Sequence, residues 1–205
     1  MEKPTSQSVR DALLDAAEVV VGRDGIANLA LDAVAAQAGL SKGGLLHHFP
    51  NKDRLVEAMV ERSADGFRRC YTEAYEATPE GPARMVRAIL DNCFSKKWTE
   101  RLRSGSAAVF AALAHNPTLI GPMRAACTEL RRRVAADQLP PGVGEAIIAA
   151  TDGLWFNWVL GLASVDEALV AQVRAALHDF HQKAAKRPSA RPRRTKTANS
   201  RRGSP

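Results

Sequence analysis

The amino-acid sequence predicts an all-α fold. Apolar residues recur at the spacing of an amphipathic helix along most of the 205-residue chain, and no stretch shows sustained strand alternation. Glycine and proline separate these periodic stretches, as expected for residues that end helices and open turns. With 45% apolar and 25% charged residues, the composition is that of an ordinary soluble globular protein. We expect about nine helices.

The first four helices are predicted from caps and periodicity. The first helix stops at Gly25, and a second, short helix covers about 31–38. Gly39 then turns the chain into a third helix over 41–48. Asn51 is a good N-cap for a long fourth helix, because its side chain can accept a hydrogen bond from a free backbone N–H. The apolar face of the first helix comprises Leu13, Ala16, Ala17, Val20 and Val21.

The middle of the chain contains three further helical stretches. Residues 78–82, Thr-Pro-Glu-Gly-Pro, form a break, after which helical spacing resumes over 85–93 and again over 107–114. Asn116 and the proline after it start another helix, which ends before Pro140. No internal repeat is present in this region.

The last two helices differ in character. Residues 143–162 are apolar almost all round, and a helix of this kind must be buried on every side. The stretch Ser164-Val-Asp-Glu167 matches a capping box, in which the hydroxyl and the carboxylate each bond an otherwise free N–H. It is expected to open the last helix. One face of that helix carries Leu169, Val170, Val173, Ala176, Leu177 and Phe180.

The net charge of +7 comes from the end of the chain. Residues 186–205 hold eight of the 29 Lys and Arg residues and no acid, so the remaining 21 are balanced by the 22 acidic residues. This segment is rich in Pro, Arg, Ser and Thr and poor in apolar residues, which predicts a disordered basic tail. The tail is either solvated and without a role, or a tether that adds sequence-independent phosphate contacts.

Cysteine usage and hydropathy favour a cytoplasmic protein. Cys70, Cys93 and Cys127 are odd in number and far apart, which indicates free thiols and no disulfide framework or zinc knuckle. No N-terminal signal pattern is recognisable. The longest uncharged stretch, 104–123, is interrupted by His115, Asn116 and two prolines, so we expect no membrane span.

The second and third helices with the Gly39 turn have the length of a helix-turn-helix unit. In such a unit the N-terminal end of the recognition helix enters the major groove of DNA. In this position Gly43 and Gly44 would allow the helix backbone to approach DNA closely, because no Cβ intervenes. The free N–H groups of the first turn, the helix dipole and Lys42 all favour phosphate.

The stretch LDAVAAQAGLSKGGLLHHFPNKDRL resembles the N-terminal helix-turn-helix of the TetR family of transcriptional repressors. The resemblance is clear over residues 9–59 and implies a DNA-binding domain at 1–55. The long fourth helix would join it to a helical ligand-binding and dimerisation domain at 56–185, followed by the tail at 186–205. Placed on this sequence, the family's DNA contacts fall on Ser41, Lys42, Gly43, Gly44, Leu46, His47, His48 and Lys52.

Three positions depart from the family pattern. Leu46 replaces a tyrosine that often touches phosphate, although a leucine can still meet a thymine methyl. Gly44 stands where Thr or Ala is frequent, and Ala30 stands where the second helix usually opens with Ser or Thr. Each departure removes a side-chain contact common in the family, which bears on operator chemistry more than on the fold.

The family pairs its last two helices with those of a second copy in a four-helix bundle. The all-apolar helix favours such a homodimer, and the alternative is a core helix buried within one chain. Gly153 and Gly161 are expected on one side of this helix, where they would permit close helix contact. The predicted interface residues are Ile147, Leu154, Trp158, Gly161, Leu162, Val173 and Leu177.

The larger domain is also expected to hold a small-molecule effector. Asp152 and Asn157 interrupt the apolar helix, and they face either a ligand cavity or hydrogen-bond partners in the interface. The candidate pocket residues are Met85, Phe94, Trp98, Phe110, Met123, Asp152, Trp155 and Asn157. A set of Met and aromatic residues is otherwise typical of a plain core. His178 and His181 have a spacing suited to a metal, but no ligand set accompanies them, so we expect surface histidines.

The function predicted from the sequence is a DNA-binding transcriptional regulator, most simply a repressor. It would bind a pseudo-palindromic double-stranded DNA operator as a homodimer and be released by a small molecule. Two alternatives from other classes remain, a helical enzyme and a helix-turn-helix module used for protein contacts. The chain shows no catalytic acid–base pair, nucleophile arrangement or metal motif, and we expect no cofactor.

Overall fold

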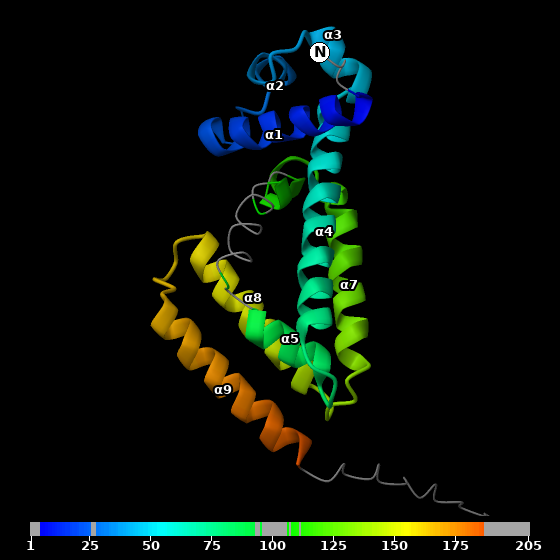
Figure 1. Ribbon diagram of the computed structural model, residues 1–205. Helices are drawn as coiled ribbons and strands as arrows, with labels where there is room; N and C mark the ends of the chain where they lie inside the picture. Colours follow the sequence, from blue (N-terminus) through cyan, green and yellow to red (C-terminus); the bar gives the residue numbers. More distant parts are fainter. Residues whose placement is uncertain are drawn as a thin grey trace, which may run out of the picture.

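The computed structural model describes residues 5–25, 28–92, 95, 106, 108–110 and 112–186. Within these ranges the secondary structure is helical and contains no strand, which confirms the predicted all-α class. The predicted basic tail lies outside the described residues, apart from Lys186. Figure 1 shows three helices at one end of the molecule and a long helix that runs from them into a larger helical body.

The first three helices are α1 (Ser6–Asp24), α2 (Leu31–Gln37) and α3 (Lys42–His48). Gly25 ends α1 as predicted, with a positive φ of 76°. Gly39 turns the chain between α2 and α3 with a φ of 67°, a region that glycine enters at little cost. These local signals place α2 and α3 where the sequence predicted them.

The fourth helix, α4, spans Lys52–Ala77 and joins the two parts of the molecule (Figure 1). The Asn51 side chain accepts a hydrogen bond from the backbone N–H of Arg54 at 2.9 Å, as expected for an N-cap. α4 packs against α1 near its start and against α5 and α7 farther along.

The remaining described elements are α5 (Arg84–Asn92), the 3-10 turn η2 (Pro117–Ile120), α7 (Gly121–Ala135), α8 (Val143–Val159) and α9 (Glu167–Ala185). Residues 108–110 and 112–115 are helical as well. α7 lies along α4, while α8 and α9 lie together on the opposite side of the body (Figure 1).

Two predicted boundaries are wrong. α8 ends at Val159 and not at residue 162, and Gly161 lies in the following turn with a φ of 63°. α9 is capped by Asp166, whose carboxylate accepts from the N–H of Leu169 at 2.8 Å, so the predicted capping box at Ser164 does not form. Ser and Asp are comparable N-caps, and the position of the turn selected the later one.

The buried apolar side chains form two clusters. The first joins α1, α2, α3 and the first part of α4, and it includes Ala108 and Ala112 from the larger body. Partly buried side chains from η2 and α7, including Ile120 and Met123, pack against the same cluster. The second cluster joins the end of α4 to α5, α7 and α8. The helix-turn-helix end is therefore packed directly against the segment around η2.

Gly144 allows the close approach of α8 to α7. A Cβ placed on Gly144 would lie well under 3.0 Å from Cγ1 of Val134. We predicted close helix contacts at Gly153 and Gly161 instead. In the described protomer no atom lies within 4 Å of a Cβ placed at either of those positions.

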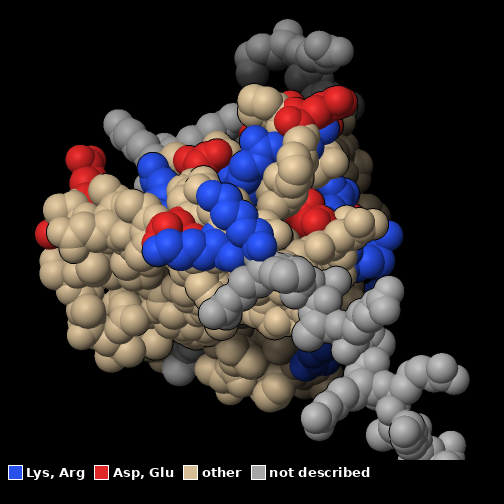
Figure 2. Space-filling model, turned by 90° about the horizontal axis from the view of Figure 1, so that it is seen from below, with Lys and Arg blue, Asp and Glu red and all other residues tan. Residues whose placement is uncertain are grey.

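Charge is distributed unevenly over the body. Seen from below, Lys and Arg side chains gather near the middle of the face and alternate with acids (Figure 2). The left part of that view, on the side of α8 and α9 in Figure 1, carries few charged side chains. No helix among the described residues is both long and apolar enough to cross a bilayer.

Candidate DNA-binding surface and ligand cavity

The first turn of α3 is built by Ser41 and two glycines. The Ser41 hydroxyl accepts a hydrogen bond from the N–H of Gly44 at 3.1 Å, which caps the helix. A Cβ on Gly44 would lie 3.4 Å from this hydroxyl, an ordinary contact, and one on Gly43 would lie 3.9 Å from it. Packing within the protein therefore does not require glycine at either position.

The side chains of α3 divide between the core and the surface. Leu45 and Phe49 are buried in the first core cluster. Leu46 is partly buried against the same core, so only part of its surface remains available to DNA. His47 is exposed, and its ring lies edge-on to that of half-buried His48 with 5.3 Å between centroids.

Two lysines flank this surface. Lys42 is exposed and its ammonium lies 3.0 Å from the carboxylate of Asp32 on α2. This exposed pair is worth little in solution, and the lysine can exchange its partner for a phosphate at small cost. Lys52 occupies the first turn of α4 and is half-buried.

Asp53 links the start of α4 to the larger body. Its carboxylate lies 2.6 Å from Nε2 of His115 and 3.5 Å from the amide nitrogen of Asn116. The hydrogen bond from His115 holds the pKa of Asp53 below its ordinary value of 3.8. The residue next to Lys52 is thus tied to the segment that precedes η2.

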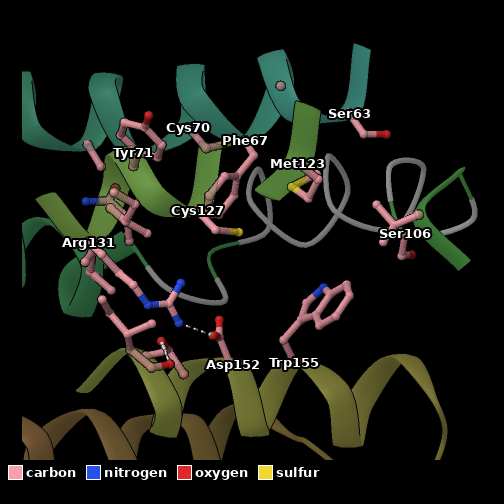
Figure 3. A pocket seen from close by; sticks show the side chains of 18 of the residues that line it. Ser63, Phe67, Cys70, Tyr71, Ser106, Met123, Cys127, Arg131, Asp152 and Trp155 are labelled. Carbon is pink, nitrogen blue, oxygen red and sulfur yellow. Dashed lines mark hydrogen bonds and ion pairs between the residues drawn. The ribbon is translucent and has the colours of Figure 1, made fainter. Parts of the chain in front are cut away.

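A cavity of about 340 Å³ lies among α4, α5, α7 and α8. In Figure 3, α4 forms the upper wall and α8 the lower wall, with Phe67 and Cys127 pointing into the space between them. Its lining is mainly apolar and aromatic, which is typical of small-molecule sites.

Some of the predicted pocket residues line the cavity and others do not. Met123, Asp152 and Trp155 line the cavity. Phe110 stacks on Trp155, with ring centroids 6.2 Å apart and planes 6° from parallel, but it is not part of the lining. Phe94 and Trp98 lie outside the described residues.

Two of the pocket predictions are wrong in position. Met85 is 1% exposed and belongs to the second core cluster, because its face of α5 turns toward α7 and α8. Asn157 does not reach the cavity, and its amide donates to the carbonyl of Gly153 one turn earlier at 2.8 Å.

The sequence reasoning missed most of the α4 and α7 wall. Phe67 and Tyr71 are four residues apart on α4 and therefore share a face, and Cys70 lies beside them. Cys127 and Arg131 repeat this spacing on α7. The spacing is visible in the sequence, but when a helix packs against neighbours on more than one face, spacing alone does not show which face lines the cavity. Burial raises the pKa of the Cys127 thiol, which keeps it protonated at neutral pH.

Asp152 provides the cavity's carboxylate. It lies 4.0 Å from a guanidinium nitrogen of Arg131, as the dashed line in Figure 3 marks. That guanidinium has a closer partner in Glu145, at 3.1 Å. Partial burial of Asp152 raises its pKa, while Arg131 acts in the opposite direction.

The two histidines of α9 are not a pair of surface residues. His178 bonds Asp91 of α5 at 2.8 Å, and His181 is 5% exposed. Our prediction of surface histidines is therefore wrong for His181, which α5 helps to cover. No group of three or more potential metal ligands occurs in the described part of the chain.

The predicted dimer residues fall into three groups. Ile147 is fully buried within its own protomer, so its place in the predicted interface is wrong. Gly161 and Leu162 follow the end of α8, and Leu162 is 70% exposed. The others are partly buried, namely Leu154, Trp158, Val173 and Leu177.

Comparison with known protein families covers both parts of the molecule. Residues 13–59 match the profile of the bacterial regulatory proteins of the tetR family. Residues 83–182 match the tetracyclin repressor-like C-terminal domain. The two profiles together account for more than two thirds of the chain.

The chain belongs to the TetR family of transcriptional regulators.

Individual relatives agree with this membership. The HTH-type transcriptional regulator BetI of Escherichia coli strain UMN026 is 26% identical over 179 residues, covering 82% of this chain and 92% of BetI. The multidrug binding protein EbrR in complex with ethidium is 27% identical with a TM-score of 0.60, covering 84% of this chain and 99% of EbrR. A transcriptional regulator from Rhodococcus sp. Rha1 shares the fold at 21% identity with a TM-score of 0.71, over 90% of this chain and all of the other.

This TetR-family member is a DNA-binding regulator with a ligand-binding fold. Its N-terminal profile match contains the whole of α2 and α3, and its C-terminal match contains α5, α7 and α8.

Proposed function

We propose that this TetR-family regulator is a repressor that binds a pseudo-palindromic operator as a homodimer and is released by a small molecule. The observation that carries the DNA part is the first turn of α3. Its glycines are not required by packing within the protein, and the exposed Lys42 beside them is held only by an ion pair with Asp32. Close approach of a phosphate backbone gives these features a common reason.

The apolar surface of α8 and α9 supports the homodimer. Large apolar side chains at the end of α8 and in the turn after it are exposed, among them Phe156 at 46% and Leu160 at 50%. Leu162 in the same turn and Phe180 on α9 are exposed as well. A second copy of the chain would remove this apolar surface from water.

Release by a ligand is supported by the cavity and by its connection to the DNA-binding end. Met123 lines the cavity and also packs against the first core cluster. A ligand that favours one arrangement of α7 and η2 would shift the position of α4 and hence of the recognition helix. EbrR, which shares this fold, was solved with ethidium, so the family fold accommodates such a ligand.

Selection of bound fragments from the source genome tests the proposal. We expect enrichment of a pseudo-palindrome whose half-sites are about one DNA turn apart, roughly 34–36 Å, or somewhat more. Sedimentation of the free protein at micromolar concentration should give a dimer. A monomer, or fragments without two-fold symmetry, would contradict the homodimer.

Lys52→Ala and His47→Ala should have different effects on DNA binding. Lys52 is expected to contact phosphate, so its removal should weaken specific and non-specific binding alike and reduce the salt slope by about 0.9. His47 is expected to meet a base edge, so its removal should relax preference at one position of each half-site. Salt titrations and binding selections measure the two effects.

The matched control for this pair is Lys183→Ala. Lys183 pairs with Asp179 on α9, outside the helix-turn-helix. It should leave affinity and salt slope unchanged. An unaltered base preference in His47→Ala would refute the base-reading role.

Asp53→Asn should loosen the connection between α4 and the body. We expect operator affinity to change by roughly two- to thirtyfold, the range seen for residues that couple distant sites. The folded-state pKa of Asp53 is lowered, so its stabilising effect is present above the ordinary value of 3.8 and is lost as pH falls through the lowered pKa. The stabilities of the parent and the variant, measured by urea unfolding, should therefore differ at pH 7 and converge as pH falls below the lowered pKa of Asp53.

Asp65→Asn is the control for this substitution. Asp65 lies on α4 as well, but its carboxylate pairs at 2.8 Å with Arg68, three residues along the same helix. Equal changes in operator affinity for the two variants would show that the Asp53 contact does not couple the two parts.

A further inference from the structure

The cavity has a polar group that the protein does not satisfy fully. We propose that the effector is a flat aromatic cation, with its positive charge beside Asp152 and its ring between the aromatic walls on α4 and α8. This inference rests on the proposed function, because it names the chemical class of the ligand for the same cavity. The argument has three steps: charge, polar satisfaction and ring contacts.

The charges at the Asp152 end of the cavity do not balance. At this end of the cavity Arg131 lies against two carboxylates, at 3.1 Å from Glu145 and at 4.0 Å from Asp152. Among the described residues, no hydrogen bond to Asp152 accompanies this distant contact. The group of three carries a net charge of −1 when both acids are ionised, which favours a cation over an anion.

The desolvation of Asp152 points in the same direction. Partial desolvation raises its pKa, but 57% of the side chain is still exposed, so water and the distant Arg131 are the partners of the ionised carboxylate. A cation bound beside Asp152 would take the place of this water as its partner and favour ionisation. An anionic ligand would need Arg131, which Glu145 already engages more closely.

Two other polar side chains of the cavity lining have partners within the protein. The Thr151 hydroxyl donates to the carbonyl of Ile148 at 2.9 Å, and the Asn92 amide donates to the carbonyl of Ala88 at 3.0 Å. These groups make no strong demand on a ligand. A neutral ligand rich in hydroxyl groups, such as a sugar, would find two buried polar groups without a partner among the described lining residues, the Tyr71 hydroxyl and the Trp155 indole N–H.

The aromatic lining suits a flat cation. Phe67 and Tyr71 from α4 and Trp155 and Phe156 from α8 line the same space. Figure 3 shows Asp152 and Trp155 side by side on α8, facing the α4 and α7 wall. The buried indole N–H of Trp155 has no hydrogen-bond partner among the described residues, so it can donate to an acceptor atom on a ligand but does not itself favour a positive charge. Cations are attracted to aromatic faces, most strongly where water is excluded.

Three probes with the same ring system and different charge test this inference. They are 10-methylacridinium, 9-methylanthracene and anthracene-9-carboxylate, each titrated calorimetrically into the full-length protein at one pH and salt concentration. We expect the cation to bind at least about tenfold more tightly than the hydrocarbon, and the anion to bind most weakly.

Neutralising an acidic and a basic residue in turn separates the effect of charge on binding from the effect of ligand shape. Asp152→Asn should reduce the ratio of cation to hydrocarbon affinity about tenfold, while Arg131→Gln should increase it because a competing cation is removed. Thermal unfolding establishes that each variant is folded, and Arg131→Gln alone still decides the question if Asp152→Asn is unstable. Tightest binding of the anion, equal binding of all three probes, or a change of the same sign in both variants would overturn the inference.

The same titrations distinguish failure of this inference from failure of the proposed function. The readout is binding to the free protein and involves no DNA. If the protein binds an operator but prefers the hydrocarbon or the anion, the proposed function stands and the cationic ligand class is contradicted. If the protein prefers the cation but enriches no operator in the genomic selection, the ligand class stands and the repressor role is contradicted.

Discussion

Gly44→Leu should weaken operator binding by about one hundredfold or more without lowering the stability of the free protein. A leucine in the first turn of α3 would hold the backbone away from DNA and remove one or two contacts, each worth about 1–3 kcal/mol. Within the protein, a Cβ at this position meets only the Ser41 hydroxyl at an ordinary distance of 3.4 Å. Leucine also has a helix propensity about 1 kcal/mol more favourable than glycine.

Gel-shift titration and urea unfolding of the same preparation measure the two parts of this prediction. Gly22→Leu is the matched control, because Gly22 is exposed near the end of α1 and no atom lies within 4 Å of a Cβ placed there. It should share the gain in helix propensity and keep parental DNA affinity. Tight operator binding by Gly44→Leu would mean that the glycine does not serve the approach to DNA.

Gly144→Ala should destabilise the protein by about 1–3 kcal/mol, although alanine is the better helix former. The new methyl group would overlap Cγ1 of Val134, a side chain that is 4% exposed in the second core cluster. Valine is branched at Cβ and has one strongly preferred rotamer in a helix, so it cannot turn away freely. Either the rotamer or the distance between α7 and α8 must change. The midpoint of urea unfolding reports the loss.

A double-mutant cycle identifies the cause of this destabilisation. In a Val134→Ala background the overlapping methyl is absent, so adding Gly144→Ala should be neutral or stabilising. Gly22→Ala provides the reference for helix propensity alone and should stabilise by about 0.5–1 kcal/mol. Additive losses in the double variant would show that overlap with Val134 is not the cause.

The sequence by itself determined the helix-turn-helix region. Gly25, Gly39, Ser41 and Asn51 act through their own backbone conformations or through hydrogen bonds to residues three positions away. Interactions that span so few residues can be recognised from the local sequence alone. The apolar spacing also predicted the inward face of the first helix, and Leu13, Ala17 and Val20 are fully buried in the structure.

The candidate cavity was predicted only in part. Asp152 stood out because a carboxylate interrupts an apolar run, and it does line the cavity. Met85 was predicted to line it on residue type alone, but residue type does not show whether a side chain faces a cavity or a core. Phe67 and Tyr71 were missed for the same reason, since α4 has neighbours on several sides along its length.

Tertiary structure alone decided how the helices are rotated and how closely they approach. The end of α8 at Val159, the choice of Asp166 as a cap and the burial of His181 each depend on where neighbouring helices lie. Gly144 shows the physical reason most directly. Its sequence neighbours do not distinguish it from Gly153, and only the position of Val134, ten residues earlier on another helix, makes the absence of its Cβ necessary.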